Sequence, residues 1–144
     1  MKLTTALLLT GALAAPVCAF ASIDGTMAQG IRERELCVVD NIDAESEFRN
    51  TLVRSLRTRG YDVKFVVEKG DCDVAMTFHA AYGVTKGWGP RRVLKASSFV
   101  VYRYSQPIAS VQFRYEKSMF GGGSNGTVEQ VISQMVFKLL PPAP

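Results

Sequence analysis

The sequence predicts an α/β (α+β) fold, a two-layer sandwich in which two helices cover one face of a mostly antiparallel sheet. Two segments, 43–60 and 127–139, carry apolar residues at helical spacing, in one stripe each. Several shorter segments alternate apolar and polar residues, as strands with one buried face do. Because each helix and the sheet has one apolar surface to bury, packing both helices on the same side satisfies all three.

The predicted element order is β-α-β-β-β-β-α. Residues 36–40 are apolar and β-branched, which is typical of a buried strand. Asp43 suits the start of the first helix, and Gly60 suits the left-handed conformation that follows a helix end. Residues 63–67 then predict the second strand, before a break at Gly70.

Three further strands are expected over 73–82, 93–104 and 108–115, the last two joined by a tight turn at 105–107. In the long middle strand one set of side chains is predicted to face the core: Leu94, Ala96, Val100, Tyr102 and Tyr104. The final helix opens with a capping box, Thr127 at the cap and Gln130 three residues later.

The first 21 residues have the pattern of a secretory signal peptide. Lys2 precedes an apolar run over 3–17, and small residues flank Phe20 where a signal peptidase would cut, near Ala21/Ser22. We therefore expect a periplasmic or secreted bacterial protein, with residues 22–35 as a flexible N-terminal tail and 36–142 as a single domain. Lipidation at Cys18 is an alternative, but the preceding Ala-Pro-Val is a poor lipobox.

The net charge limits the classes of binding partner that we expect. After loss of Lys2 the chain keeps 16 basic and 13 acidic side chains, a net charge near +3. Dedicated nucleic-acid binders cluster their positive charge more strongly, so no nucleic acid is expected. Another envelope protein or an anionic envelope component is the expected partner, a homodimer is an open possibility, and no transmembrane segment is expected in the mature chain.

Two cysteines remain after processing, Cys37 and Cys72, and an oxidising compartment favours a disulfide between them. Two separate buried thiols are the alternative. A tight hairpin at Gly70 would place Cys72 far from Cys37, whereas a return of the chain over 68–72 would bring them together. A disulfide therefore predicts the return. No metal site is expected, because His79 is the only histidine and no paired Cys-x-x-Cys occurs.

No catalytic constellation is visible, so we predict that the protein is not an enzyme and has no cofactor. His79 lies in the middle of a strand without an adjacent nucleophile. A small hydrolase that uses His79 with Asp73 or a serine is one alternative. A toxin-neutralising, immunity-type protein is the other.

Two surfaces are candidates for binding. The loops after the third and fifth strands are expected at the same end of the sheet, where they would form a rim of cations and aromatics. This rim comprises Trp88, Arg91, Arg92, Lys117 and Phe120. Trp88 can instead fold back as a lid on the sheet edge. The second candidate is the sheet face opposite the helices, with Lys95, Arg103 and Arg114 among apolar residues that include Phe99 and Val101. Plain solvated sheet is the alternative there.

The order of motifs resembles a group of bacterial envelope domains. The motifs are the strand at 36–40, the helix end and strand start at 56–63, Cys72-Asp73-Val74, and the hairpin with Val101-Tyr102-Arg103. Over residues 36–140 the chain resembles the periplasmic α/β domain of curli-secretion-channel and penicillin-binding-protein-activator lipoproteins. It is also similar to the N-terminal domain of the Tol translocation protein and to uncharacterised exported proteins of similar layout.

That resemblance implies a non-enzymatic envelope role and transfers no functional residue. The lipobox of the lipoprotein members is missing, so the resemblance does not extend to outer-membrane anchoring or pore formation. Residues and resemblance together predict a non-catalytic exported binding or accessory protein that acts through contacts with proteins or envelope components.

Overall fold

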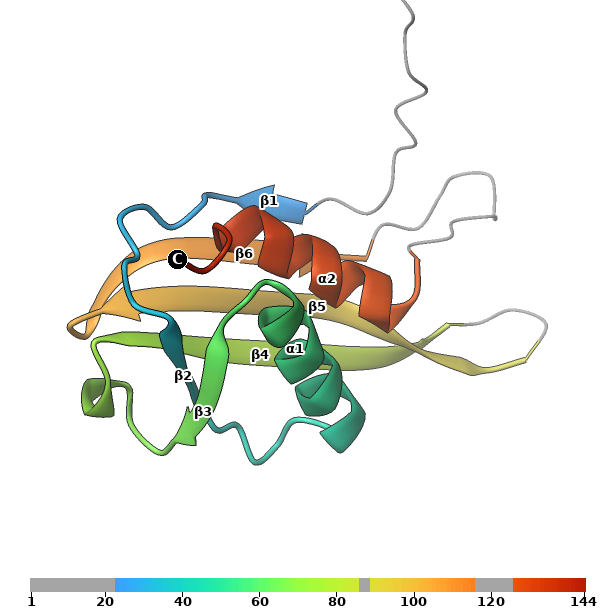
Figure 1. Ribbon diagram of the computed structural model, residues 1–144. Coiled ribbons are helices and arrows are strands. Elements are labelled where there is room, and N and C mark those ends of the chain that lie inside the picture. Colours follow the sequence, from blue (N-terminus) through green and yellow to red (C-terminus); the bar gives the residue numbers. More distant parts are fainter. Residues whose placement is uncertain (1–22, 86–88, 116–125) are drawn as a thin grey trace, which may run out of the picture.

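The computed structural model describes residues 23–85, 89–115 and 126–144. These residues form one mixed sheet with two helices on one of its faces (Figure 1). In chain order the elements are β1 (Ile23–Gly25), β2 (Glu35–Val39), α1 (Ser46–Thr58), β3 (Asp62–Val66), the short 3₁₀ helix η1 (Lys69–Asp71), β4 (Val74–Thr85), β5 (Arg91–Arg103), β6 (Gln106–Arg114) and α2 (Val128–Leu139).

The strands lie in the order β1-β6-β5-β4-β2-β3. β2 runs parallel to both β3 and β4, and the β4–β5, β5–β6 and β1–β6 pairs are antiparallel. α1 is the crossover between the parallel strands β2 and β3, and α2 packs beside it. The predicted fold class and the predicted order of strands and helices are therefore confirmed.

The core lies between the helices and the sheet. Phe48 of α1 is at its centre, with its ring stacked 5.8 Å from that of Phe78 and edge-on 6.2 Å from that of Phe99. From α2 the fully buried side chains are Ile132, Met135, Val136 and Leu139. The stripes read from the sequence are thus the surfaces that pack together.

Cys37 and Cys72 form a disulfide with their Cα atoms 6.2 Å apart, as predicted. After β3 the chain runs back through η1 before it starts β4, so β4 is parallel to β2 and Cys72 lies beside Cys37. A tight hairpin at Gly70 is therefore excluded. In the chain-entropy account, closing this loop stabilises the fold by roughly 3–4 kcal/mol.

The predicted facing of β5 is wrong over most of its length. Ala81 pairs with Ala96 and Tyr82 with Leu94, which leaves Lys95 as an extra residue in a β-bulge. An extra residue reverses the alternation, because side chains on a strand point to opposite faces with a period of two. Consequently Phe99 and Val101, expected on the open face, are fully buried under the helices.

The hairpin turn also differs from the prediction. β5 ends at Arg103 and β6 begins at Gln106, so Tyr104 and Ser105 form the turn rather than residues 105–107. Both have positive φ, 46° and 64°. Two successive residues of this kind match the twist of a two-residue hairpin. The side chain of Tyr104, expected in the core, is 65% exposed.

The segment expected as a flexible tail contains an additional strand. β1 pairs with β6 over Ile23–Gly25, and Ala28 beyond it is buried. Gly25 is required for this pairing, because a Cβ there would lie 2.3 Å from the carbonyl oxygen of Ser110. Three residues with no clear alternation carry too little pattern to predict a strand.

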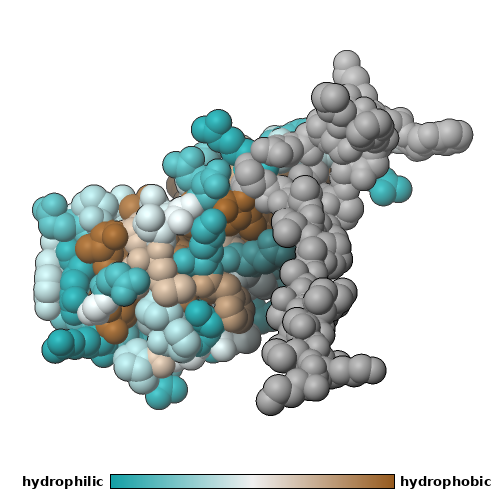
Figure 2. All heavy atoms as spheres, turned by 90° about the horizontal axis from the view of Figure 1, so that it is seen from above, coloured by the Kyte–Doolittle hydropathy of each residue, from teal (hydrophilic) through white to brown (hydrophobic). Residues whose placement is uncertain are grey.

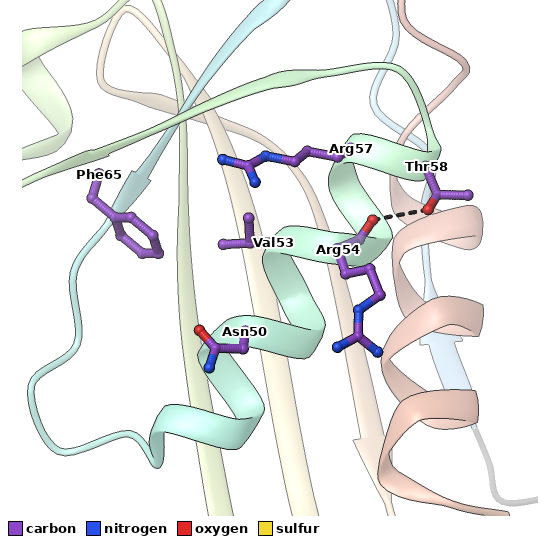
Figure 3. Close-up of a pocket in the computed structure, with 6 residues that line it drawn as sticks. All are labelled: Asn50, Val53, Arg54, Arg57, Thr58 and Phe65. Atoms are coloured by element: carbon purple, nitrogen blue, oxygen red, sulfur yellow. Dashed lines mark hydrogen bonds between the residues drawn. The ribbon is translucent and has the colours of Figure 1, made fainter.

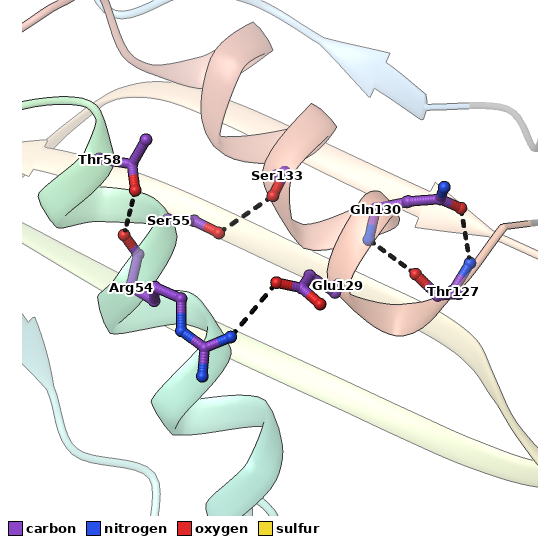
Figure 4. A network of polar contacts seen from close by, with 7 residues as sticks. All are labelled: Arg54, Ser55, Thr58, Thr127, Glu129, Gln130 and Ser133. Atoms are coloured by element: carbon purple, nitrogen blue, oxygen red, sulfur yellow. Dashed lines mark hydrogen bonds and ion pairs between the residues drawn. The ribbon is translucent and has the colours of Figure 1, made fainter.

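The two helices begin differently. α2 has the predicted capping box, in which Thr127 accepts from the Gln130 N–H and the Gln130 side chain accepts from the Thr127 N–H. α1 begins after Glu45, not Asp43, and has no side-chain cap. Across the helices, Arg54 pairs with Glu129 at 3.3 Å and the Ser55 and Ser133 hydroxyls lie 3.2 Å apart (Figure 4). Within the described ranges no helix is long and apolar enough to span a membrane.

Candidate functional site

A groove of about 670 Å³ lies between the outer face of α1 and the last strand of the sheet, β3. Its lining combines cationic, amide and apolar side chains. The lining residues are Asn50, Val53, Arg54, Arg57, Thr58 and Phe65. Figure 3 shows the Phe65 ring on one side and Val53 and Arg57 extending toward it from α1. We call this the α1–β3 groove.

Two local periodicities build this groove. On α1 the residues Phe48, Leu52 and Leu56 are fully buried, so positions between them project away from the core. On β3 the side chains alternate, and Val63 packs against the core on the helix side. Phe65, two residues later, lies on the same side but beyond the cover of α1, and its side chain is 40% exposed.

The only charged side chains in the lining of the groove are the cations Arg54 and Arg57. Arg54 is engaged by Glu129 of α2. Arg49, above the groove, pairs with Asp40 at 2.9 Å and its guanidinium lies 5.0 Å from the centre of the Phe65 ring. Arg57 is exposed and makes no ion pair or side-chain hydrogen bond with any described residue. The groove therefore offers one uncommitted guanidinium next to an aromatic ring.

The predicted rim is only partly within the described residues. Trp88, Lys117 and Phe120 lie outside the described ranges. Arg91 is exposed at the start of β5. Arg92 is held by an ion pair with Glu45 and lies 4.8 Å from the Tyr82 ring centre, so it braces the start of α1 against β4. Burial first, and then the nearby acids Glu45 and Glu47, raise the pKa of Tyr82 above its ordinary value, against the opposing effect of Arg92.

The three cations predicted for the open sheet face have different surroundings. Arg114 is exposed and pairs with Ala96 on the face opposite the helices, as expected. The Lys95 ammonium lies 4.2 Å from the centre of the Tyr115 ring. Arg103 is not on the open face, because it alternates with Tyr102 and shares the side of the buried Val101.

Arg103 instead anchors the segment that precedes β2. Its guanidinium donates to the Gly30 carbonyl at 2.7 Å and to the Glu33 carboxylate at 2.9 Å. Partial burial alone would raise the pKa of Glu33. Hydrogen bonds from the Arg32 N–H and from Arg103 outweigh that effect and hold the pKa below its ordinary value. The role of Arg103 is therefore structural.

Among the described residues, the other side chains that could take part in catalysis or metal binding form no further site. His79 is exposed on the open sheet face, directly opposite Ser98 on β5, and it does not line the groove. Ligand atoms of Glu35, Cys37 and Cys72 lie within 4.8 Å of one another. Because both sulfurs belong to the disulfide, this cluster offers no thiolate to a metal ion.

Sequence reasoning missed the groove, although one signal was present. The sequence analysis assigned no binding role to the arginines of the first helix, and it placed Phe65 only within the strand over 63–67. An aromatic residue on an edge strand, next to a basic helix face, is the pattern that would have indicated the site. Which strand forms the edge could not be read from the chain.

Comparison with known proteins identifies the fold. No family model and no curated protein matches the chain. Among solved structures it is similar to a PelC dodecamer from Paraburkholderia phytofirmans, at 16% identity and a TM-score of 0.60, over 82% of this chain and 98% of that one. It is also similar to a variant PelC dodecamer from the same species, at 15% identity and a TM-score of 0.56, over 81% and 92%.

A minor lipoprotein from Acinetobacter baumannii is more distant, at 9% identity and a TM-score of 0.39, over 70% of this chain and 86% of that one. That likeness supports no argument. At these identities the PelC likeness shows a shared fold and nothing more. None of the three bears on the families named in the sequence analysis, so that resemblance stays a prediction.

Proposed function

We propose that this chain is an exported accessory protein of the bacterial cell envelope that acts by binding other proteins and assembling with copies of itself, not by catalysis. The observation that carries the proposal is the Cys37–Cys72 disulfide, because such bonds persist mainly outside the reducing cytosol. The signal-peptide pattern over residues 1–21 supports the same compartment.

Self-assembly and the binding of other proteins are supported by different features. The solved PelC structures with this fold are dodecamers. Separately from self-assembly, the α1–β3 groove and the adjoining sheet edge support the binding of other proteins, because they offer an exposed aromatic ring and a cation without an ion-pair partner among the described residues, residue types over-represented where binding energy concentrates. These features favour action by contact.

The test is to express the full chain with its leader in a bacterium and to fractionate the cells. We expect a periplasmic product that begins near Ser22 by mass spectrometry, with no free thiol at Cys37 or Cys72 before reduction. Light scattering after size exclusion should give a mass of at least twice the protomer mass. An uncleaved, reduced protein in the cytosol would contradict export, and a monomer at every concentration would contradict assembly.

The hydrolase alternative has one observation in its favour, the direct cross-strand placement of His79 and Ser98. An esterase and peptidase screen that compares the wild type with His79→Ala would test it. A turnover that disappears in His79→Ala would support the alternative, and equal background traces would remove it.

A further inference from the structure

We propose that the α1–β3 groove binds an extended acidic segment of a partner protein, which adds to the sheet as a new strand along the outer edge of β3. This inference rests on the proposed function, since it specifies the chemistry of the partner. Three features support it: the backbone of β3, the side chains beside it, and the charges around it.

The backbone of β3 presents unpaired groups to solvent. In a parallel pair, successive residues direct their N–H and C=O alternately toward and away from the neighbouring strand. The Asp62 N–H donates to Arg34 at 3.0 Å, and the Val66 carbonyl accepts from Asp40 at 2.9 Å, so these residues face β2. Val63 and Phe65 therefore face outward, where no described strand pairs with them.

Extended peptides bind such edges by supplying the missing backbone hydrogen bonds, while alternate side chains provide specificity. The side chains of an added strand that point to the helix side would lie next to Phe65. α1 is on that side, so they would meet Val53, Asn50 and Arg57 across the groove (Figure 3). The groove and the free edge are thus two parts of one site.

Charge selects an acidic occupant. Arg57 is available on the helix side of β3, and Lys64 is exposed on the opposite side of the same strand. Two of the acids beside this strand already have cationic partners, since Asp40 pairs with Arg49 at 2.9 Å and Asp62 with Arg34 at 3.5 Å. Glu68 lies past the end of the strand, and Glu35 lies on β2, away from the outer edge. A carboxylate on either face of the added strand would therefore meet a cation.

The same charges disfavour a symmetric pair of copies joined through β3. Such a pair would bring Lys64 close to its own counterpart, and Arg57 to its own, and like charges across adjacent strands are destabilising. The occupant is therefore a different, acidic segment.

The probe is a fluorescein-labelled nine-residue peptide of alternating valine and glutamate, measured by anisotropy on the mature oxidised protein. We expect saturable binding, and no binding of a matched valine–lysine peptide. Hydrogen exchange should show new protection at the Val63 and Phe65 amides, which face outward. Absence of binding, or binding without protection at these two amides, would overturn the inference.

Variants separate strand addition from general attraction. Arg57→Glu should weaken binding at least about 10-fold. Phe65→Pro removes the N–H that faces outward from β3. Edge strands tolerate proline at such a position, so the circular dichroism spectrum should stay native while peptide binding is abolished. Phe65→Ala keeps the N–H and should reduce affinity less, so it tests the site even if Phe65→Pro does not fold.

Arg114→Glu is the matched control, an exposed arginine on the opposite sheet face. It should leave affinity unchanged, and an effect equal to that of Arg57→Glu would overturn the inference. Light scattering on the same samples separates this proposal from the proposed function. If the protein is an oligomer but does not bind the acidic peptide, only the proposed β3 site is contradicted. If the protein is a monomer that stays in the cytosol, the proposed function itself is contradicted.

Discussion

The two edge strands of the sheet, β1 and β3, differ in how many contacts hold them to the rest of the fold. At one edge, hydrogen bonds hold β1 and the residues after it in place. The Lys138 ammonium donates to the Ile23 carbonyl. The Thr26 N–H donates to the Ser110 carbonyl at 3.0 Å, and the Ala28 N–H donates to the Leu139 carbonyl at 2.7 Å. At the other edge, the outward backbone of β3 meets no described strand, and beyond it the side chain of Val67 is 84% exposed.

Proteins commonly protect sheet edges against unwanted pairing, by charges, by short strands or by covering segments. β1 is held by α2 and by the residues after β1, whereas β3 has only two charged side chains, Asp62 and Lys64, and a length of five residues. Figure 2, seen from the top of Figure 1 where β1 lies, shows apolar residues in separate patches among hydrophilic ones. This contrast is the reason why the proposed contact site is placed at β3 and not at β1.

The largest expected effect on stability comes from removing the disulfide on the β3 side of the sheet. The double change Cys37→Ala with Cys72→Ala should lower the free energy of unfolding by roughly 3–4 kcal/mol, since the closed 35-residue loop is released. Urea unfolding followed by circular dichroism measures this. Reductant added to the wild type should reproduce the loss, and a loss of less than about 1 kcal/mol would mean that the disulfide is not constraining the unfolded chain.

The next effect breaks the β1 side. In Gly25→Ala the new methyl group would lie 2.3 Å from the Ser110 oxygen and 2.6 Å from the Val111 Cα, both backbone atoms that cannot rotate away. We expect a loss of about 1–3 kcal/mol, or detachment of β1. Faster hydrogen exchange at the Thr26 amide would show the detachment. Gly89→Ala is the control that isolates the steric clash, because Gly89 also has a positive φ, 137° against 157° for Gly25, but no atom of the described residues lies within 4 Å of the added Cβ.

A smaller effect is expected from weakening α2, the helix that holds β1 in place. Thr127→Ala removes half of the capping box and should lower the free energy of unfolding by about 1 kcal/mol. Thr58→Ala is the matched control, because its hydroxyl bonds only to the Arg54 carbonyl of its own helix. Equal losses for the two variants, measured by thermal unfolding, would show that the cap is not what stabilises α2.

The smallest effect concerns the segment between the two edges, which Arg103 anchors through Glu33. Because the pKa of Glu33 is lowered in the folded state, its contribution is complete above the ordinary carboxyl pKa and is lost as the pH falls through the folded value. Glu33→Gln should therefore reduce stability slightly at pH 7 and have a smaller effect at pH 2. Urea unfolding at both pH values checks this, and a larger effect at pH 2 would contradict the sign.

The sequence predicted the elements better than their facing. The stripes of α1 and α2, the Thr127 cap and the strand segments were all recognisable, because each depends on residues within a few positions of one another. The orientation of Phe99 and Val101 was predicted wrongly, since the bulge at Lys95 depends on how β5 pairs with β4. A single unpaired residue reversed every position after it.

The candidate site was predictable only in its parts. Arg57 and Phe65 were each visible in the chain, but nothing local places them on opposite sides of a groove. The open-face prediction for Arg103 failed for the same reason, because its partner Glu33 is 70 residues away in a segment expected to be a tail. The predicted rim at Trp88, Lys117 and Phe120 stays a prediction.

By itself the sequence determined the helix and strand segments and the spacing of the two cysteines, because periodicity and capping act over single turns and strands. Only the tertiary structure decided that β4 returns parallel to β2, that β1 forms one edge of the sheet, and that β3 forms the other edge, beside a basic groove and without a further partner strand among the described residues. These outcomes depend on contacts between residues 35 to 115 positions apart, whose energies no local pattern encodes.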